Sequence, residues 1–332
     1  MRLLNIVCNY DTMPPMRKYI TKAYAKVNLG LDILGRRDDG YHLVDMILQS
    51  VDIYDVLTLY AGEASELTKI RAEEGVSEDE RITMSIRQSS YGERLAANRS
   101  NLCIRAAEKI FESALENPSD SSRLNLHIQL EKNIPIAAGM AGGSTDAAAV
   151  LRGANILMAR PLDIKGLAEI GLSLGADIPF CIEGGCIRAG GIGEELNTIE
   201  PKELWELVIA KPPVAVSTAE AYRGFDEAKD IRHPDMDAVE LGLEAGDINK
   251  VSRELLNVLE EVTKKNCLII GDIEKIMMEN GATAALMTGS GPTVFGLCPD
   301  GETAKRAAAA IKDKGLCPEC FTSRMIIPEY EI

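Results

Sequence analysis

An α+β fold with two domains and a cleft between them is predicted from the order and pattern of the chain. Segments with apolar side chains at every second position, typical of half-buried strands, occur among helix-forming segments without any internal repeat. The 332 residues and 46% hydrophobic content allow a large core that two domains share. We expect a disordered extension at 1–17, an N-terminal domain at 18–200 and a C-terminal domain at 201–332.

Charge and cysteine content exclude several classes of partner. The net charge of −15 argues against nucleic acid and against an anionic membrane. No apolar run approaches the ~18 residues of a membrane span, and the apolar patch 3–7 is too short for a signal peptide. The eight cysteines are scattered, so we expect reduced thiols and a cytoplasmic protein. Cys317 and Cys320 form the only close pair, where we expect no metal because further ligands are lacking, while a redox role stays open.

The first predicted strand carries a polar face. Apolar residues occupy the odd positions of 23–33, so Lys26 and Asn28 project from one face, about 7 Å apart. An ordinary solvated face explains the same pattern. The turn-rich loop that follows ends in Tyr41 and His42, which suit stacking on and hydrogen bonding to a heterocycle, or simple packing of the turn.

The next part of the chain is predicted to be mainly β structure. Apolar stretches at 43–51 and 54–60 indicate strands, and the Glu-rich segment 61–80 is expected to be an exposed, mobile insertion. A strand, a helix and a loop follow in that order: 82–87, 101–115 and 117–122.

A glycine-rich segment, Pro135 to Asp146, is the most informative part of the chain. It follows the alternating strand pattern of 124–130 and precedes an alanine-rich helix, which we expect Ser144 and Thr145 to cap. Its glycines let backbone N–H groups approach a ligand, and a helix N-terminus favours anions, so the segment predicts a site for nucleotide phosphates. A simple glycine-rich turn is the alternative. The Walker A motif does not fit, since the loop has no lysine, and neither does the dinucleotide fingerprint.

A second candidate site residue is Asp177. The helix that Asp163 caps is expected to stop at Gly175, which places Asp177 in a turn before Pro179. A carboxylate fixed in this way is well placed for a functional role. The alternative is that Asp177 only stabilises the turn, because Asp is common in turns. The remaining elements are predicted in chain order: short strands around 184–191, a strand at 205–211, a helix capped by Ser217 or Thr218, a helical region 235–265 interrupted at 246–247, a strand–turn–strand unit at 285–297, a helix at 304–311 and a strand at 323–327.

Three separated motifs stand in order along the chain: Ala25-Lys26-Val27-Asn28-Leu29, the segment 135–146, and Thr288-Gly289-Ser290-Gly291-Pro292. Together they resemble the superfamily of galactokinase, homoserine kinase, mevalonate kinase and phosphomevalonate kinase (GHMP kinases). Two further signatures, Gly35–His42 and Leu174–Pro179, are similar to those of the kinase family that acts on 4-diphosphocytidyl-2-C-methyl-D-erythritol. The resemblance covers residues 20–298, and its specificity comes from the combination of motifs.

The resemblance implies a two-domain GHMP kinase fold with the active site between the domains. It implies transfer of the ATP γ-phosphoryl group to the 2-hydroxyl of that substrate in non-mevalonate isoprenoid biosynthesis, with Lys26 and Asp177 as catalytic pair and Ser144 beside Mg²⁺. The residues implied to cradle ATP are Pro135, Ile136, Ala137, Ala138, Gly139, Met140, Ala141, Gly142, Gly143, Ser144 and Thr145. Those implied to hold the substrate are Asn28, Tyr41, His42, Thr218 and Tyr222.

The sequence departs from the family pattern at 1–17, at 61–80 and at 97–100, the last of which leaves the adenine pocket unassigned. A sibling kinase acting on mevalonate or homoserine, and a catalytically silent nucleotide sensor of the same fold, are the alternatives. The signature ending in Tyr41-His42 counts against the siblings, and the presence of both Lys26 and Asp177 counts against the sensor. A monomer and a homodimer are equally compatible with the sequence.

Overall fold

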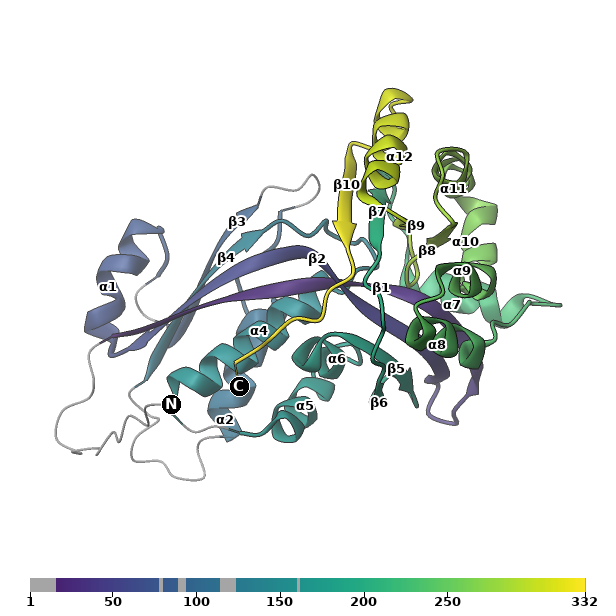
Figure 1. The fold of residues 1–332 in the computed structure, drawn as a ribbon. Coiled ribbons are helices and arrows are strands. Elements are labelled where there is room, and N and C mark those ends of the chain that lie inside the picture. The colour runs from purple at the N-terminus through teal and green to yellow at the C-terminus, as the bar shows by residue number, and fades with distance from the viewer. Residues whose placement is uncertain (1–15, 78–79, 89–93, 114–123, 160–161, 332) are drawn as a thin grey trace.

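The computed structural model describes residues 16–77, 80–88, 94–113, 124–159 and 162–331. Nearly all of the predicted extension and the whole predicted loop 117–122 therefore lie outside the described residues. Arg17, which we placed in the extension, begins the first strand. The molecule is built from one mixed sheet and one antiparallel sheet, with helices packed on both (Figure 1). This arrangement confirms the α+β prediction.

The first sheet has six strands, in the order β3-β4-β2-β5-β6 with β1 paired to β2. Its members are β1 (Arg17–Arg36), β2 (His42–Gly62), β3 (Ile82–Gln88), β4 (Asn125–Lys132), β5 (Cys186–Gly190) and β6 (Glu195–Thr198). The stretches 43–51 and 54–60, which we predicted separately, are one continuous strand, β2. Antiparallel pairing with β1 continues on both sides of residues 52 and 53, although the register is interrupted there, between the Lys26–Ser50 and Tyr24–Tyr54 pairs.

Four helices cover one face of this sheet (Figure 1). They are α2 (Leu102–Ser113), α4 (Gly142–Leu157), α5 (Ile164–Leu172) and α6 (Ile178–Glu183). The helix α4 is the central one, and twelve of its sixteen residues are buried, because alanines let it pack closely on β1. Asp163 caps α5 by accepting a hydrogen bond from the Gly166 N–H at 2.8 Å, as predicted.

The prediction of an exposed, mobile insertion at 61–80 was wrong for most of this segment. Residues Ala64–Glu73 form the helix α1, and Leu67 is fully buried. A reciprocal capping interaction between Glu63 and Glu66 begins the helix. The high Glu content that we took as a sign of disorder therefore includes the residues that stabilise the helix N-terminus.

The second sheet has four antiparallel strands, in the order β10-β7-β9-β8. They are β7 (Glu206–Lys211), β8 (Ala284–Met287), β9 (Val294–Cys298) and β10 (Glu319–Arg324). The helices of this half are α7 (Thr218–Glu227), α8 (Met236–Ala245), α9 (Ile248–Glu254), α10 (Glu260–Asn266), α11 (Ile269–Glu279) and α12 (Gly301–Asp313).

Most predicted elements of this half are confirmed, but α11 was not predicted, β10 begins at Glu319 rather than at 323, and two further differences involve the other half. The helical region 235–265 breaks at Gly246-Asp247 as predicted, but it also breaks at 255–259, where the chain forms a parallel bridge between Asn257 and Leu31. The last strand ends at Arg324 rather than at 327, because Met325 instead pairs with Val51 of the first sheet. Tertiary contacts with the other half cause both differences.

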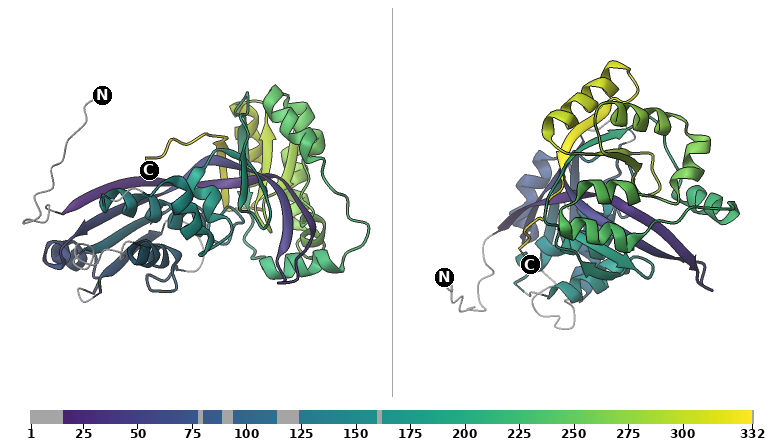
Figure 2. Two further views of the ribbon diagram at one scale, coloured as in Figure 1. Left: turned by 90° about the horizontal axis from the view of Figure 1, so that it is seen from below. Right: turned by 45° about the vertical axis from the view of Figure 1, so that its right-hand side comes forward.

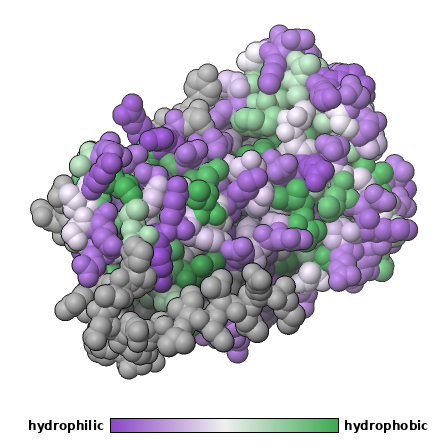
Figure 3. All heavy atoms as spheres, turned by 60° about the vertical axis from the view of Figure 1, so that its left-hand side comes forward, coloured by the Kyte–Doolittle hydropathy of each residue, from purple (hydrophilic) through white to green (hydrophobic). Residues whose placement is uncertain are grey.

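The two halves contact each other through β1 and β2, which extend toward α8 and the second sheet (Figure 2). A Cβ atom on Gly30 would lie 2.7 Å from the Met236 sulfur of α8, so a larger residue at position 30 would require this side chain to move. The molecular face in Figure 3 is mainly hydrophilic, with apolar areas between polar ones. Within the described ranges, no helix is both long and apolar enough to cross a membrane.

Candidate active site

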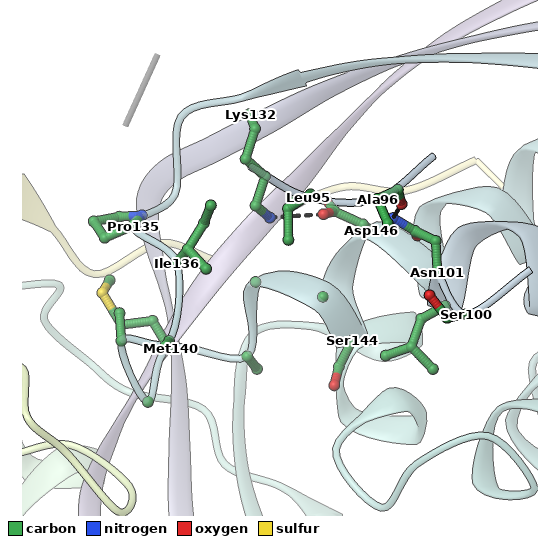
Figure 4. Close-up of a pocket in the computed structure, with 17 residues that line it drawn as sticks. Leu95, Ala96, Ser100, Asn101, Lys132, Pro135, Ile136, Met140, Ser144 and Asp146 are labelled. Atoms are coloured by element: carbon green, nitrogen blue, oxygen red, sulfur yellow. Dashed lines mark hydrogen bonds and ion pairs between the residues drawn. The ribbon is translucent and has the colours of Figure 1, made fainter. Parts of the chain in front are cut away.

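The glycine-rich segment forms one wall of a pocket of about 420 Å³ (Figure 4). Pro135 to Ser144 all line it, and Ala137, Gly139 and Ala141 have positive φ angles that curl the segment around the pocket. Gly139 meets the β8–β9 hairpin so closely that a Cβ atom would lie 2.6 Å from the Thr288 carbonyl oxygen. The β8–β9 hairpin of the second sheet therefore supports the glycine-rich segment 135–146, the candidate phosphate loop, which belongs to the first half of the molecule.

The helix after the segment begins differently from the prediction. The helix α4 starts at Gly142, its N-cap is Ala141 in the left-handed conformation, and no side chain caps it. The expectation that Ser144 and Thr145 are caps was wrong, since both lie inside the first turn. Ser144 lines the pocket, whereas Thr145 is fully buried and is not among the lining residues. A left-handed alanine replaces the usual hydroxyl cap because the backbone turns sharply into the helix.

A buried group of three charged residues fastens both ends of the segment. Lys132 Nζ lies 2.5 Å from Asp55 Oδ2 and 2.6 Å from Asp146 Oδ2, and all three residues are at most 3% exposed. Asp55 also accepts hydrogen bonds from the Asn133 and Ile134 N–H groups at 2.5 and 2.8 Å. Asp55 thereby holds the start of the segment, while Lys132 joins it to Asp146 near the start of α4.

The electrostatics of this group follow from its burial. Burial raises the pKa of the Asp146 carboxyl well above its usual value, against the opposing effect of Lys132. Burial alone lowers the pKa of Lys132, but the carboxylates of Asp146 and Asp55 outweigh it and raise that pKa above its ordinary value. Lys132 therefore stays charged. This group could not be predicted from the sequence, because Asp55 is 77 residues away from Lys132 and only the fold brings them together.

The far end of the pocket is formed by the segment that we left unassigned. Leu95, Ala96, Ser100, Asn101 and Leu102 line it. The Asn101 side chain donates to the Ala96 carbonyl at 3.0 Å and accepts from the Cys103 N–H at 2.9 Å, so it fixes this corner to the start of α2 (Figure 4). The pocket therefore has a polar end at the glycine segment and a mixed, partly apolar end here.

Lys26 and Asp177 lie together beside the glycine segment. The Lys26 ammonium is 4.0 Å from Asp177 Oδ2, and it donates to Asn28 Oδ1 at 2.7 Å and to the Gly139 carbonyl at 3.2 Å. Lys26 is 4% exposed, whereas the Asp177 side chain is 37% exposed. The pair thus combines a buried, fixed cation with a carboxylate that reaches solvent.

Asp177 lies in a turn, as predicted, and it is also the N-cap residue of the short helix α6. Its side chain makes no capping hydrogen bond and is left available to the site. Asn28 is held from the other side, since its N–H donates to Thr288 Oγ1 at 2.9 Å. The Asn257 side chain in turn donates to the Met287 and Gly289 carbonyls, both at 2.8 Å, and so fixes the hairpin that carries Thr288.

His42 and Tyr222 form a second wall of the site, from opposite halves of the chain. Their ring centroids are 4.9 Å apart, and burial raises the pKa of Tyr222 to about 12, with Asp177 adding to the effect. Thr218 Oγ1 lies 2.8 Å from Ser290 Oγ, which joins α7 to the hairpin. Tyr41, by contrast, is 59% exposed and takes part in neither contact. Ser217, not Thr218, caps α7.

Asp226 is a further residue of this wall, and no pattern in the sequence indicated it. His42 Nε2 lies 2.8 Å from Asp226 Oδ1, and Arg36 approaches the other carboxylate oxygen at 3.5 Å. A carboxylate only accepts hydrogen bonds, so Nε2 of His42 must carry the proton. In the neutral imidazole, Nδ1 is then a hydrogen-bond acceptor.

No preformed metal centre accompanies these residues. Across the described parts of the chain, no three or more His, Cys, Asp or Glu side chains form a group that could hold an ion. Cys317 and Cys320 are buried free thiols, and the Cys317 thiol donates to the Lys211 carbonyl at 2.7 Å. Burial raises the pKa of Cys317 to about 12 and that of Cys320 to about 11, so neither is an activated thiolate.

Comparisons with known proteins agree with this arrangement. The family models described as GHMP kinases N terminal domain and GHMP kinases C terminal match residues 101–185 and 238–316. The 4-diphosphocytidyl-2-C-methyl-D-erythritol kinase of Alkaliphilus metalliredigens is 43% identical over 293 residues, which cover 88% of this chain and 92% of that protein. The kinase of the same name from Clostridium perfringens is 40% identical over 305 residues, or 92% of this chain and 97% of that one.

Solved structures show the same relationship. A crystal structure of 4-(cytidine 5'-diphospho)-2C-methyl-D-erythritol kinase superposes with a TM-score of 0.70 at 26% identity, covering 92% of this chain and 99% of that one. The mevalonate kinase of L. major reaches a TM-score of 0.73 at 14% identity, over 95% and 98% of the two chains, which shows a shared fold alone. The chain therefore belongs to the 4-diphosphocytidyl-2-C-methyl-D-erythritol kinase family of the GHMP kinases.

Proposed function

We propose that the chain transfers the γ-phosphoryl group of ATP to the 2-hydroxyl of 4-diphosphocytidyl-2-C-methyl-D-erythritol. The observation that carries the proposal is the position of the Lys26–Asp177 pair. Lys26 contacts Gly139 of the pocket wall, and Asp177 is close enough to Tyr222 to raise its pKa. A carboxylate and an ammonium thus lie between a phosphate-binding candidate and an aromatic wall, where an acceptor hydroxyl must be placed.

In this proposal Asp177 accepts or orients the proton of the attacking hydroxyl. Phosphoryl transfer depends mainly on positioning and charge neutralisation, so one exposed carboxylate at the acceptor is sufficient. Lys26 stabilises the charge that grows on the attacking oxygen, and its contacts to Asn28 and Gly139 hold it in place without reorganisation.

The phosphates of ATP are bound by the glycine segment and the start of α4. The first N–H groups of a helix lack intrahelical partners, and the helix dipole adds positive potential. Mg²⁺, when bound with the nucleotide, neutralises phosphate charge. Mg²⁺ usually takes one or two protein ligands and keeps phosphates and waters as the others, so it does not require a cluster of acidic side chains, and none is found within the described residues. Ser144 is the hydroxyl on the pocket wall that suits this role. The partly apolar end around Leu95 and Leu102 suits the adenine.

The cytidyl group is proposed to lie against His42 and Tyr222. With its Nε2–H directed to Asp226, His42 offers Nδ1 as an acceptor for the exocyclic amino group of cytosine, and Tyr222 offers a ring face. Thr218 and Asn28 are proposed to contact the rest of the acceptor. Tyr41 is exposed in this structure, and we propose that its ring packs over the base when the substrate is bound.

The test is ADP release with a panel of acceptors in the presence of Mg²⁺. We expect turnover with the cytidyl substrate and little with mevalonate or homoserine. Comparable turnover with either of these two would instead indicate a mevalonate or homoserine kinase. Binding of ATP without turnover on any acceptor would favour the silent sensor. We also propose that the protein is cytoplasmic and that its two domains divide near residue 200. The proposed oligomeric state is a monomer or a homodimer, which sedimentation of the purified chain tests.

A further inference from the structure

A buried arginine outside the pocket has no place in the reaction described above. Arg152 lies on α4, is 1% exposed, and donates from one terminal nitrogen to the Cys181 and Ile182 carbonyls at 2.6 and 3.3 Å. No carboxylate of the described residues forms an ion pair with it. Burial lowers the pKa of Arg152 from its usual value, but a guanidinium remains charged. Burying a cation without a counterion costs free energy, which suggests that Arg152 has a role.

The contacts of Arg152 are made to the helix that begins at Asp177. Cys181 and Ile182 belong to the last turn of α6, where unpaired carbonyls attract a cation. Because α6 has only six residues, about 9 Å, holding its last turn also fixes its first. Arg152 also lies on α4, the helix whose first turn forms the end of the phosphate-loop candidate. It thus sets the position of Asp177 relative to that loop.

The C-terminal segment Ile326–Tyr330 covers Arg152 from the other side. This segment leaves β10 of the second sheet and returns over the first half of the molecule (Figure 1). The Ile326 N–H donates to the Ser50 carbonyl at 3.0 Å, and the Gln49 side chain donates to the Ile326 carbonyl at 2.8 Å. The Tyr330 ring centroid lies 3.6 Å from the Arg152 guanidinium carbon.

The seat of this segment on α6 is shaped for it. Gly184 ends α6, and a Cβ atom there would lie 2.7 Å from Pro328 Cγ and 2.8 Å from a Tyr330 ring carbon. Burial raises the pKa of Tyr330 to about 12, so its ring stays neutral and faces the cation. The segment therefore packs on both the arginine and the end of the helix that the arginine binds.

We propose that Arg152 is a positioning residue for Asp177, and that the C-terminal segment holds Arg152 in place through Tyr330. The proposal rests on the proposed function, because it acts through Asp177. Small displacements of a group at a reacting centre cost up to about 10²-fold in rate. Loosening α6 should therefore lower kcat and leave the KM for ATP nearly unchanged, since the glycine segment is not touched.

The experiment compares Tyr330→Ala with Tyr330→Phe in the full chain. Tyr330→Ala removes the ring and is expected to lower kcat about 10-fold with an ATP KM within twofold of wild type. Tyr330→Phe keeps the ring and is expected to turn over at nearly the wild-type rate. Arg152→Lys, which keeps the charge but not the planar fork, should resemble Tyr330→Ala. If Arg152→Lys does not fold, the tyrosine pair still decides.

A double-mutant cycle with Asp177→Asn separates positioning from a general structural role. If Tyr330 acts through Asp177, then adding Tyr330→Ala to Asp177→Asn lowers kcat no further. Hydrogen exchange of the peptide 176–185 gives an independent measurement, and faster exchange in Tyr330→Ala is expected. Multiplied kcat losses in the cycle, or wild-type kcat and exchange in Tyr330→Ala, would overturn the proposal. Failure of the proposed function differs from both, because the wild type would then show no turnover with the cytidyl substrate.

Discussion

The ammonium of Lys26 lies 4.0 Å from the carboxylate of Asp177, although the two residues are 151 positions apart in the chain. Lys26 is buried and bonded to Asn28 and Gly139, while the Asp177 carboxylate reaches solvent and caps nothing. The cation is therefore fixed by the fold, and the carboxylate remains free to meet an acceptor. This relationship motivates the first prediction.

Asp177→Asn is expected to lower kcat by roughly 10²–10⁴-fold, the usual contribution of a positioned acid–base group. ATP affinity should change little, since the pocket proposed to bind the phosphates is not lined by Asp177. Asn is as good an N-cap residue as Asp, so thermal unfolding should be close to that of the wild type. Steady-state kinetics and a melting curve on the same preparation check this, and a nearly normal kcat would end the catalytic assignment.

Ser144→Ala is expected to raise the Mg²⁺ concentration needed for half-maximal turnover and to lower kcat, with the fold intact. The hydroxyl lies on the pocket wall and makes no capping bond, so its loss removes a metal contact rather than a helix stop. A Mg²⁺ titration at saturating ATP measures the effect. An unfolded variant, or an unchanged Mg²⁺ requirement, would contradict it.

Asp226→Asn is expected to weaken discrimination between the cytidyl substrate and a uridyl analogue by about 10-fold or more. An amide can donate as well as accept, so His42 would no longer be restricted to the form with Nδ1 as acceptor. A site built on one hydrogen-bonding pattern can reject the wrong partner by up to about 10⁴-fold. Glu220→Gln, an exposed change on the same helix, is the control.

The measurement is kcat/KM for both acceptors, together with the imidazole ¹⁵N shifts of His42. Unchanged discrimination in Asp226→Asn, or a wild-type spectrum with the proton on Nδ1, would show that Asp226 does not select the tautomer.

Lys132→Met is expected to destabilise the fold by about 3–5 kcal/mol, because it leaves Asp55 and Asp146 buried without their shared cation. Lys165→Met is a control at an exposed position. Chemical denaturation of the two variants gives the comparison, and a loss below about 1 kcal/mol for Lys132→Met would mean that the group is not coupled as described.

Stability is expected to depend on pH through His127. Burial lowers the pKa of His127 from 6.5 to about 4. Between these values the unfolded chain binds a proton that the folded chain does not, so this contribution is complete above pH 6.5 and is lost as pH falls toward 4. The slope is at most about 1.4 kcal/mol per pH unit. His127→Gln should flatten the unfolding free energy over this window, and identical curves for variant and wild type would exclude the effect.

The sequence by itself determined the features that depend on neighbours along the chain. Alternation placed β1 and β4, the Asp163 cap began α5, and the glycine segment between strand and helix indicated one wall of the pocket. These features follow from local backbone geometry and the polarity of nearby side chains, which the residues specify directly. The resemblance of the separated motifs supplied the kinase family, which the relatives confirm.

Only the tertiary structure decided which distant residues meet. Asp226 with His42, Asp55 with Lys132, and Tyr330 with Arg152 are pairs separated by 184, 77 and 178 positions. Other tertiary contacts overrode local signals, since burial of Leu67 stabilises a helix in a Glu-rich segment, and pairing with Val51 takes Met325 out of β10. Burial is the physical reason, because a charge or a ring is stabilised by the groups that surround it after folding, and those groups are set by topology rather than by spacing.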